Sequence, residues 1–380
     1  MSFQQLTCPV QHYPWGEKPT AEHTPFIPRL LGQSPGTEPW AELWIGSHPQ
    51  ASAVVTSTNE TLLAQIQREP LANLGARLAG QRTLPYLLKV LCCDEPLSIQ
   101  SHPDKQTAER YHRLFPQDFP DDNHKPEIIY ALTEFRAMAG FRPIADILSD
   151  LRRHPSLSPW AEALSAQPGH REICEFLLHS SPTPLRQMES QLLTERLDTP
   201  SDRLFTLLAK RYPGDCGIFF AYLLNLVVLQ PGQAIFVQAN MPHAYLCGEG
   251  VECMANSNNV IRAGLTHKTI RKDLLLESLD FREHPVASLL VPPAKQEQLS
   301  CDFTCPDFRI RIFGPGITIP VEQGSPAVLL ILSGQAKLQD SDNCITASQG
   351  TTWFKAAELT NATVMAEGEQ SRVVLVTAVQ

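Results

Sequence analysis

The spacing of hydrophobic positions divides the chain into β-like outer parts and a helical middle. The segment LPYLLKVLCC (84–93) is apolar except for Pro85 and Lys89, which is typical of a strand buried on both faces. The following LSIQSHP alternates, so Ser98, Gln100 and His102 are predicted to lie on one face of a strand. Residues 226–255 predict three more strands, with turns at Gly232 and at 248–250.

Helical spacing replaces this alternation over residues 143–216. The pairs Thr183-Pro184 and Thr199-Pro200 each combine an N-cap residue with proline at the first helical position, so each predicts a helix start. Residues 172–179 are a further helical candidate inside this all-helical insert, and residues 268–279 are one beyond it.

The C-terminal hundred residues return to short strands and turns, as in RIRIFG and AVLLILSGQAKLQ. This pattern predicts a small antiparallel sandwich or jelly roll. The last histidine of the chain is His284, so a C-terminal roll cannot hold a histidine-based metal site. We interpret this part as a structural or partner-facing domain. The predicted domains are residues 1–142 and 217–280 for one unit, 143–216 for the insert and 281–380 for the roll.

Composition narrows the possible functions. The 380 residues suffice for two or three domains, and 43% hydrophobic with 19% charged residues indicates a packed globular protein. A net charge of -9 without basic runs argues against a nucleic-acid surface. No apolar run could span a membrane and no secretory signal opens the chain, so we expect a cytoplasmic location. Ten cysteines without a CxxC pair indicate buried thiols rather than a thiolate zinc site.

Several polar residues stand where the pattern predicts burial. Gln100 and His102 could form half of a metal site, although a single strand histidine is more often structural. Glu127 precedes the apolar IIYAL and requires a metal, a cation or a proton; a salt bridge is the alternative. His243 is either a ligand or a satisfied core residue. Glu252, between Val251 and Cys253, is a candidate general base or a structural carboxylate.

Arg262 and Lys268 flank the segment AGLTH. An arginine fork matches a phosphate or an enediolate oxygen, whereas plain surface charge is the alternative for both residues.

These residues lie in motifs that resemble those of the type I phosphomannose isomerases. The resemblance rests on YPWG, AELWIGSHP, LPYLLKVL, LSIQSHPDK, NHKPE, PHAY and VECMANSNNVIRAGLTHK, which occur in this order. It covers the N-terminal part and residues 217–275. The resemblance implies a mainly β fold of cupin-type jelly rolls with the helical insert. It also implies a zinc-dependent isomerase, monomeric, that interconverts mannose 6-phosphate and fructose 6-phosphate and contributes to GDP-mannose biosynthesis.

The same resemblance assigns roles residue by residue. One zinc ion per chain would be held by Gln100, His102, Glu127 and His243. Glu252 would be the base and Arg262 the catalytic arginine, while the substrate-binding candidates are Ser98, Lys125, Lys268 and Lys89.

The chain departs from the family pattern at two positions: Asn258 stands where aspartate is common and His267 where proline is common. An iron-dependent cupin oxygenase, with two histidines and a carboxylate, is a rival reading. A sugar-binding cupin, which would tolerate loss of Glu252, is the other.

Overall fold

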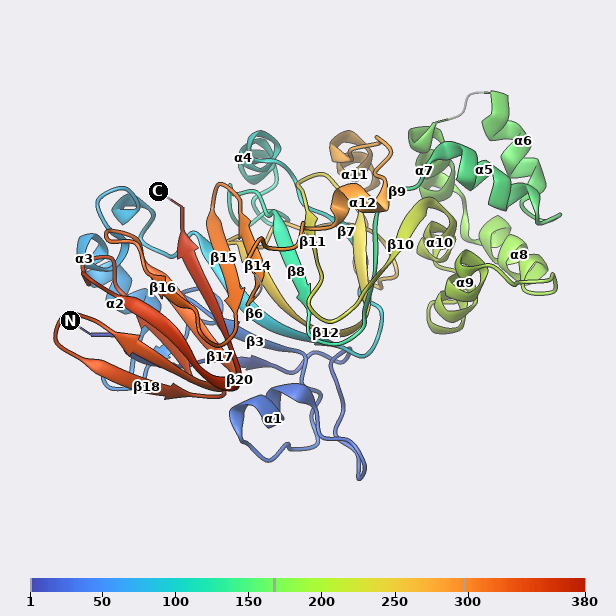
Figure 1. Ribbon diagram of the computed structural model, residues 1–380. Coiled ribbons are helices and arrows are strands. Elements are labelled where there is room, and N and C mark those ends of the chain that lie inside the picture. Colours follow the sequence, from blue (N-terminus) through green and yellow to red (C-terminus); the bar gives the residue numbers. More distant parts are fainter. Residues whose placement is uncertain (1, 167–168, 297, 380) are drawn as a thin grey trace.

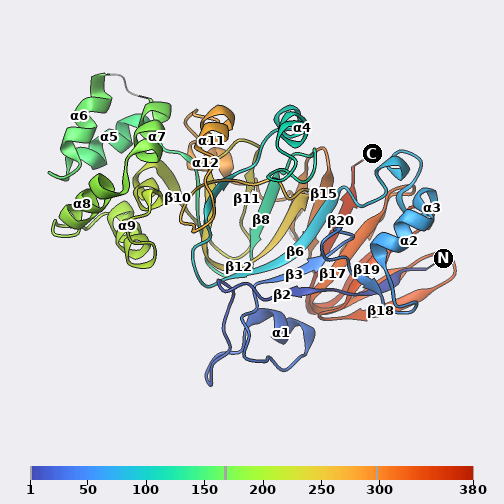
Figure 2. The ribbon, with the colours of Figure 1, turned by 180° about the vertical axis from the view of Figure 1, so that it is seen from behind.

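Two antiparallel sheets and a group of helices make up the protein in the computed structural model, which describes residues 2–166, 169–296 and 298–379. In Figure 1 the helical group and the C-terminal strands lie at opposite ends, with the first sheet between them, and the reverse view in Figure 2 shows the same order. The predicted mainly β, cupin-type fold with a helical insert is confirmed.

Ten strands pair in the first sheet, whose main path runs β10-β9-β12-β6-β3-β2. Its strands are β2 Val10–Gln11, β3 Glu42–Ile45, β6 Tyr86–Cys93, β7 Ile99–Ser101, β8 Glu127–Ala131, β9 Phe135–Phe141, β10 Leu224–Leu229, β11 Ala234–Val237, β12 His243–Ala255 and β13 Ile261–Gly264.

The second sheet, also of ten strands, has the main path β14-β15-β20-β17-β19-β1-β4-β5. Its strands are β1 Gln4–Thr7, β4 Val54–Val55, β5 Glu60–Thr61, β14 Leu299–Thr304, β15 Phe308–Phe313, β16 Thr318–Pro320, β17 Ala327–Gln339, β18 Cys344–Ser348, β19 Thr352–Lys355 and β20 Thr363–Ala378. The predicted unit 1–142 therefore contributes to both sheets, because β1 pairs in register with β19.

Most helices lie outside the sheets. The α-helices are α1 Phe26–Leu31, α2 Leu62–Arg68, α3 Pro70–Leu74, α4 Lys105–Leu114, α5 Ile144–Arg152, α6 Ser158–Ala166, α7 His170–His179, α8 Pro182–Leu192, α9 Pro200–Arg211, α10 Phe220–Leu223, α11 Lys272–Ser278 and α12 Val286–Leu289. Short 3₁₀ turns occur at Ala79–Gln81 and Cys216–Phe219.

The helical insert follows the sequence signals with two corrections. Thr199 caps α9 through a reciprocal bond with Asp202, as its pairing with Pro200 predicts. The helix start predicted at Thr183 is wrong, because Ser181 and Pro182 supply the same N-cap and proline arrangement two residues earlier. The helix predicted over 268–279 begins only at Lys272.

The strand β12 corrects the turn predicted at 248–250. It runs without interruption through Gly248, which has φ +123°. Residues before Gly248 pair with β9, and those from Gly248 onward pair with β6. A Cβ at this position would meet the backbone of Glu134 and Phe135 at 2.7–2.8 Å. Glycine therefore marks a change of partner inside one strand, not a turn.

The strand β6 is buried on both faces, as the sequence predicts. Leu88 and Val90 belong to the apolar core shared by the two sheets. The alternate residues, Leu87, Lys89 and Leu91, face the interior of the first sheet. The single lysine in this apolar run is thereby directed into the interior that contains the candidate site.

Candidate metal centre and active site

Three side chains converge inside the first sheet. His102, Glu127 and His243 have potential ligand atoms that all lie within 4.8 Å of one another, and each side chain is fully buried. Nε2 of His243 lies 3.0 Å from Oε1 of Glu127, and Nε2 of His102 lies 3.4 Å from Oε2. Three separate segments, the end of β7, the start of β8 and the start of β12, bring these groups together.

Backbone carbonyls orient both imidazoles. Nδ1 of His102 donates to the carbonyl of Asn259 at 2.7 Å, and Nδ1 of His243 donates to the carbonyl of Met241 at 2.9 Å. Because a carbonyl can only accept, each Nδ1 carries a proton, and Nε2 of each ring faces the cluster. Outer bonds of this kind commonly fix the rings of metal-binding histidines.

The cluster contains buried atoms that lack hydrogen-bond partners. Among the described residues, Nε2 of His243 and Oε2 of Glu127 are buried without a hydrogen bond, although Oε2 forms an ion pair with the Lys125 ammonium at 3.0 Å. Nε2 of His243 lies 3.0 Å from Oε1 of Glu127, and a metal ion could bind both atoms. The donor set of two imidazoles and one carboxylate suits zinc, so the residues fit a metal ion.

Charge around the cluster favours an ionised Glu127. Burial alone would raise the pKa of its carboxyl, but Lys125 and the two histidines outweigh burial and hold this pKa well below its usual range. Nζ of Lys125 lies 3.0 Å from the carboxylate, and Tyr245 donates to it at 2.9 Å. Burial, assisted by Lys125, lowers the pKa of His102 to about 4, which keeps that ring neutral.

The strand register places Gln100 and Arg262 beside these groups. Gln100 is the register partner of His243 on one side and of Arg262 on the other. Register partners share a sheet face, so the three side chains form a row across β13, β7 and β12. Arg262 is half-buried, burial lowers the pKa of its guanidinium, and no ion pair reaches it within the described ranges.

A second group of buried charges lies on the strands next to this row. Glu252 and Lys89 are register partners on β12 and β6, and their side chains form an ion pair at 3.0 Å. Glu42 lies 3.4 Å from the same ammonium, and the ring of Trp44 packs against it with a centroid distance of 5.2 Å. The lysine is therefore held between two carboxylates and an aromatic face.

Burial has opposite effects on the two members of this ion pair. It raises the pKa of Glu252, and the Lys89 ammonium limits the rise. Burial would lower the pKa of Lys89, but Glu252 and Glu42 outweigh it and raise that pKa. A carboxylate in this environment has a higher proton affinity than one in water, which is what a general base requires.

The amino-acid sequence matches a known family. The family description "Phosphomannose isomerase type I, catalytic domain" fits residues 3–144. The mannose-6-phosphate isomerase of Salmonella typhimurium is 35% identical over 98% of this chain and 99% of its own length, and that of Bos taurus is 35% identical over 87% of both. The chain belongs to the type I phosphomannose isomerases.

Solved structures of the family extend the likeness to the full fold. The apo form of the Salmonella typhimurium enzyme superposes with a TM-score of 0.86 at 32% identity and covers all of both chains. A zinc-bound mannose 6-phosphate isomerase gives a TM-score of 0.87, also at 32% identity and full coverage. The C-terminal sheet, which contains none of the family motifs named above, is thus shared with the family.

Two predicted site residues remain apart from the buried cluster. Ser98 is half-buried just before β7, in the alternation that includes Gln100. Lys268 is exposed between β13 and α11, and within the described ranges its side chain has no hydrogen bond or ion pair. Both roles therefore stay predictions.

Sequence reasoning missed the residues that support the cluster. Asp121 accepts bonds from Ser257, from the backbone of Asn258 and from the side chain of Asn259, whose carbonyl orients His102. Its position in DDNHKPE, just before the quoted NHKPE, is the signal that could have indicated it. Trp44 and Glu42 lie inside AELWIGSHP, so the motif contained them although no role was assigned.

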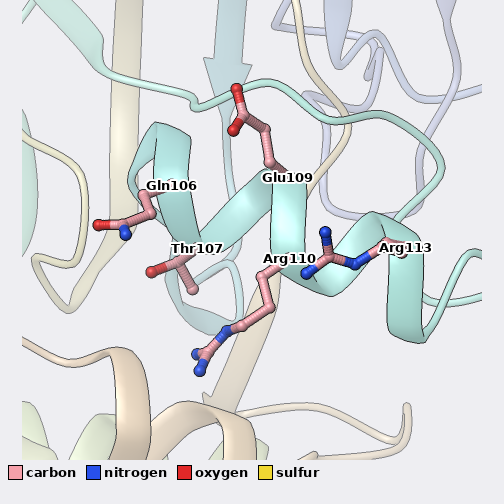
Figure 3. Close-up of a pocket in the computed structure, with 5 residues that line it drawn as sticks. All are labelled: Gln106, Thr107, Glu109, Arg110 and Arg113. Atoms are coloured by element: carbon pink, nitrogen blue, oxygen red, sulfur yellow. The ribbon is translucent and has the colours of Figure 1, made fainter.

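A surface cavity lies on α4, which begins just after His102. It has a volume of about 450 Å³ and is lined by Gln106, Thr107, Glu109, Arg110 and Arg113. Figure 3 shows Glu109 and Arg110 extending from different sides of the helix. Arg110 is paired with Glu277 of α11. None of the predicted site residues lines this cavity, so it is not the buried centre.

Proposed function

We propose that this protein is a zinc-dependent isomerase that interconverts mannose 6-phosphate and fructose 6-phosphate. The observation that carries the proposal is the buried His102–Glu127–His243 cluster beside the Glu252–Lys89 ion pair. A metal site next to a buried carboxylate with a raised pKa is what a proton transfer between adjacent sugar carbons needs. The activity and zinc content named for the relatives support it.

The zinc ion would be held by Nε2 of both histidines, by Glu127 and by Gln100. When bound, zinc would supply Lewis-acid polarisation and orientation of sugar oxygens. The register of Gln100 next to His243 supports its inclusion as the fourth ligand. One ion per chain follows from a single cluster of this kind within the described residues.

Glu252 would transfer the proton. In the open-chain aldose its carboxylate removes the C2 proton, the electron pair forms a C1–C2 double bond, and the C1 carbonyl electrons move to O1. The O2 proton passes to O1 through this cis-enediol, and the protonated Glu252 returns its proton to C1 as the C2 carbonyl forms. Lys89 keeps Glu252 ionised before the reaction because its ammonium lies 3.0 Å from the carboxylate. Lys89 and Lys125 are also near enough to the buried cluster to bind substrate oxygens.

Arg262 would stabilise the developing oxyanion. It is the half-buried, unpaired cation in the row that includes Gln100 and His243. A preorganised guanidinium in a site shielded from water stabilises developing negative charge more than it does in bulk solvent. Ser98 and Lys268 would bind the phosphate group at the outer side of the site.

The cellular setting follows from the activity. We propose a monomeric cytoplasmic enzyme that exchanges mannose 6-phosphate with the hexose phosphate pool and so contributes to GDP-mannose biosynthesis. No described helix is long and apolar enough to cross a membrane.

A coupled assay with mannose 6-phosphate tests the function. The purified protein should convert it to fructose 6-phosphate, lose nearly all activity on exhaustive chelation and regain it with zinc. The same turnover under strictly anaerobic conditions separates an isomerase from an oxygenase. Full activity after chelation, with no metal found by elemental analysis, would contradict the zinc assignment.

A further inference from the structure

The second sheet contains an arginine directed into its apolar interior. Arg311 lies in β15 and is only 7% exposed. Its sequence neighbours Ile310 and Ile312 belong to the core between the two sheets, so Arg311 points to the opposite face. On that face its register partner Leu375 belongs to the interior cluster of the second sheet.

The guanidinium of Arg311 makes no ion pair among the described residues, although Asp302 and Glu322 are near enough to act on it electrostatically. Its Nε and Nη2 atoms are buried and make no hydrogen bond there. The carboxylate opposite it in the register, Asp302, instead accepts two bonds of 2.8 Å from Arg309. Burial, reinforced by the charge of Arg309, lowers the pKa of Arg311. A buried cation without a partner is strongly unfavourable, which indicates that an anion completes the site.

Other cations increase the positive charge at this end of the sheet. Lys355 is fully buried and donates to the carbonyls of Glu322 and Ser325, both at 3.0 Å, and burial lowers its pKa to about 8. The exposed carboxylate of Glu322 is close enough to act electrostatically on Lys355, Arg309 and Arg311. Because Arg309 is paired with Asp302, the two cations Lys355 and Arg311 share the carboxylate of Glu322.

We propose that Arg311 is the centre of an anion site in the C-terminal sheet that binds a small phosphate group. The planar guanidinium offers parallel donors that match two oxygens of a phosphate, and burial makes such charge-assisted bonds strong. The site is separate from the metal centre and does not depend on the proposed isomerase activity.

Phosphate titration of the full-length protein tests this site. In a chloride buffer of matched ionic strength, the wild-type protein should be stabilised by inorganic phosphate in thermal denaturation. Isothermal titration should then detect one fewer bound phosphate in Arg311→Met than in the wild type. Arg262→Met, the matched control, should keep the Arg311 site because it removes the unpaired arginine of the first sheet instead.

Stability without phosphate gives a second readout. If the Arg311 site is empty in phosphate-free buffer, Arg311→Met removes an unpaired buried charge and should raise Tm under that condition. Arg311→Lys keeps the charge but loses the fork, so it should bind phosphate about tenfold more weakly. Unchanged phosphate stoichiometry in Arg311→Met, or a lower Tm for it without phosphate, would overturn the proposal.

Discussion

The strands β12 and β17 have the same form but carry different side chains. Each has 13 residues and contains a glycine with positive φ, Gly248 or Gly334. Each strand changes partners near that glycine: β12 pairs with β7 and β9 before it and with β6 and β8 after it, whereas β17 exchanges β19 for β18 and stays paired with β20. The inward positions of β12 include His243 and Glu252, whereas those of β17 are apolar, as at Leu329.

This difference shows that the strand geometry does not itself create the active site. The interior of the first sheet accommodates buried charges largely through ion pairs, as that of Glu252 with Lys89. The corresponding interior of the second sheet is mainly hydrophobic and stabilises the fold by burial. The two sheets therefore differ in which inward positions carry ionisable groups, and exchanging those groups tests the distinction.

Removal of the charge at Glu252 should have the largest effect on turnover. Glu252→Gln keeps the shape of the side chain but cannot accept the proton, so kcat should fall by roughly 10²–10⁴-fold. Metal content, measured by elemental analysis, should stay at one zinc per chain because Glu252 is not in the cluster. Near-normal kcat would place the base elsewhere, with Lys125 the next candidate.

Glu249→Gln is the matched control for that experiment. Glu249 lies on the same strand and is also buried, at 9% exposed against 3% for Glu252, but it pairs with Arg29 on the opposite side of the sheet. Its kcat should equal that of the wild type. A comparable loss of activity in both variants would show that β12 tolerates no neutral replacement, and the comparison would then say nothing about catalysis.

Arg262→Lys should have the next largest effect. The lysine keeps the positive charge but cannot reproduce the planar fork, so kcat should fall by about 10- to 100-fold with a smaller change in KM. Steady-state kinetics with mannose 6-phosphate separate the two parameters. A change in KM alone would make Arg262 a ground-state phosphate contact instead of a group that stabilises the transition state.

Stability should depend on pH through Glu249. Burial and the nearby Glu17 raise its pKa from 4.5 to about 7. Between these values the folded protein holds a proton that the unfolded chain has released, so the free energy of unfolding falls as pH rises. The free energy of unfolding can change by at most roughly 3 kcal/mol through this pKa shift. Denaturant titrations from pH 5 to 8 should show this decline in the wild type and a flatter profile in Glu249→Gln; parallel profiles would refute it.

The sequence predicted the elements that carry the metal cluster because short-range patterns determine them. Alternation predicted a strand through Gln100 and His102, and the structure has β7 end at Ser101, one residue before His102. The proline before Glu127 indicated the start of a strand, as the structure has it. The cluster itself needs three strands from distant parts of the chain. Their convergence followed from the resemblance to a family, since spacing within one segment cannot specify pairing between segments.

Other features lay beyond any local pattern. The turn expected at 248–250 was wrong because a glycine pair looks the same whether a chain reverses or a strand changes partners. The pairing of β1 with β19 joins residues about 350 positions apart, so the N-terminal sequence gives no sign of it. Arg311 likewise reads as one residue of an alternating strand, and only the register shows that Arg309 occupies the opposing carboxylate.

The smallest expected effect concerns the contact between the two regions. His124 precedes Lys125 in the loop before β8, and its Nε2 lies 3.0–3.1 Å from both carboxylate oxygens of Asp307, between β14 and β15. Asp307→Asn weakens this link, so Lys125 should be less well positioned and kcat should fall by about three- to tenfold. Zinc content should not change, because Asp307 does not contact the cluster.

Asp307→Glu should recover part of the activity, while Asp342→Asn, in an exposed turn of the same sheet, should have no effect. Equal kcat in Asp307→Asn and the wild type would show that the second sheet supports the fold without positioning the active site.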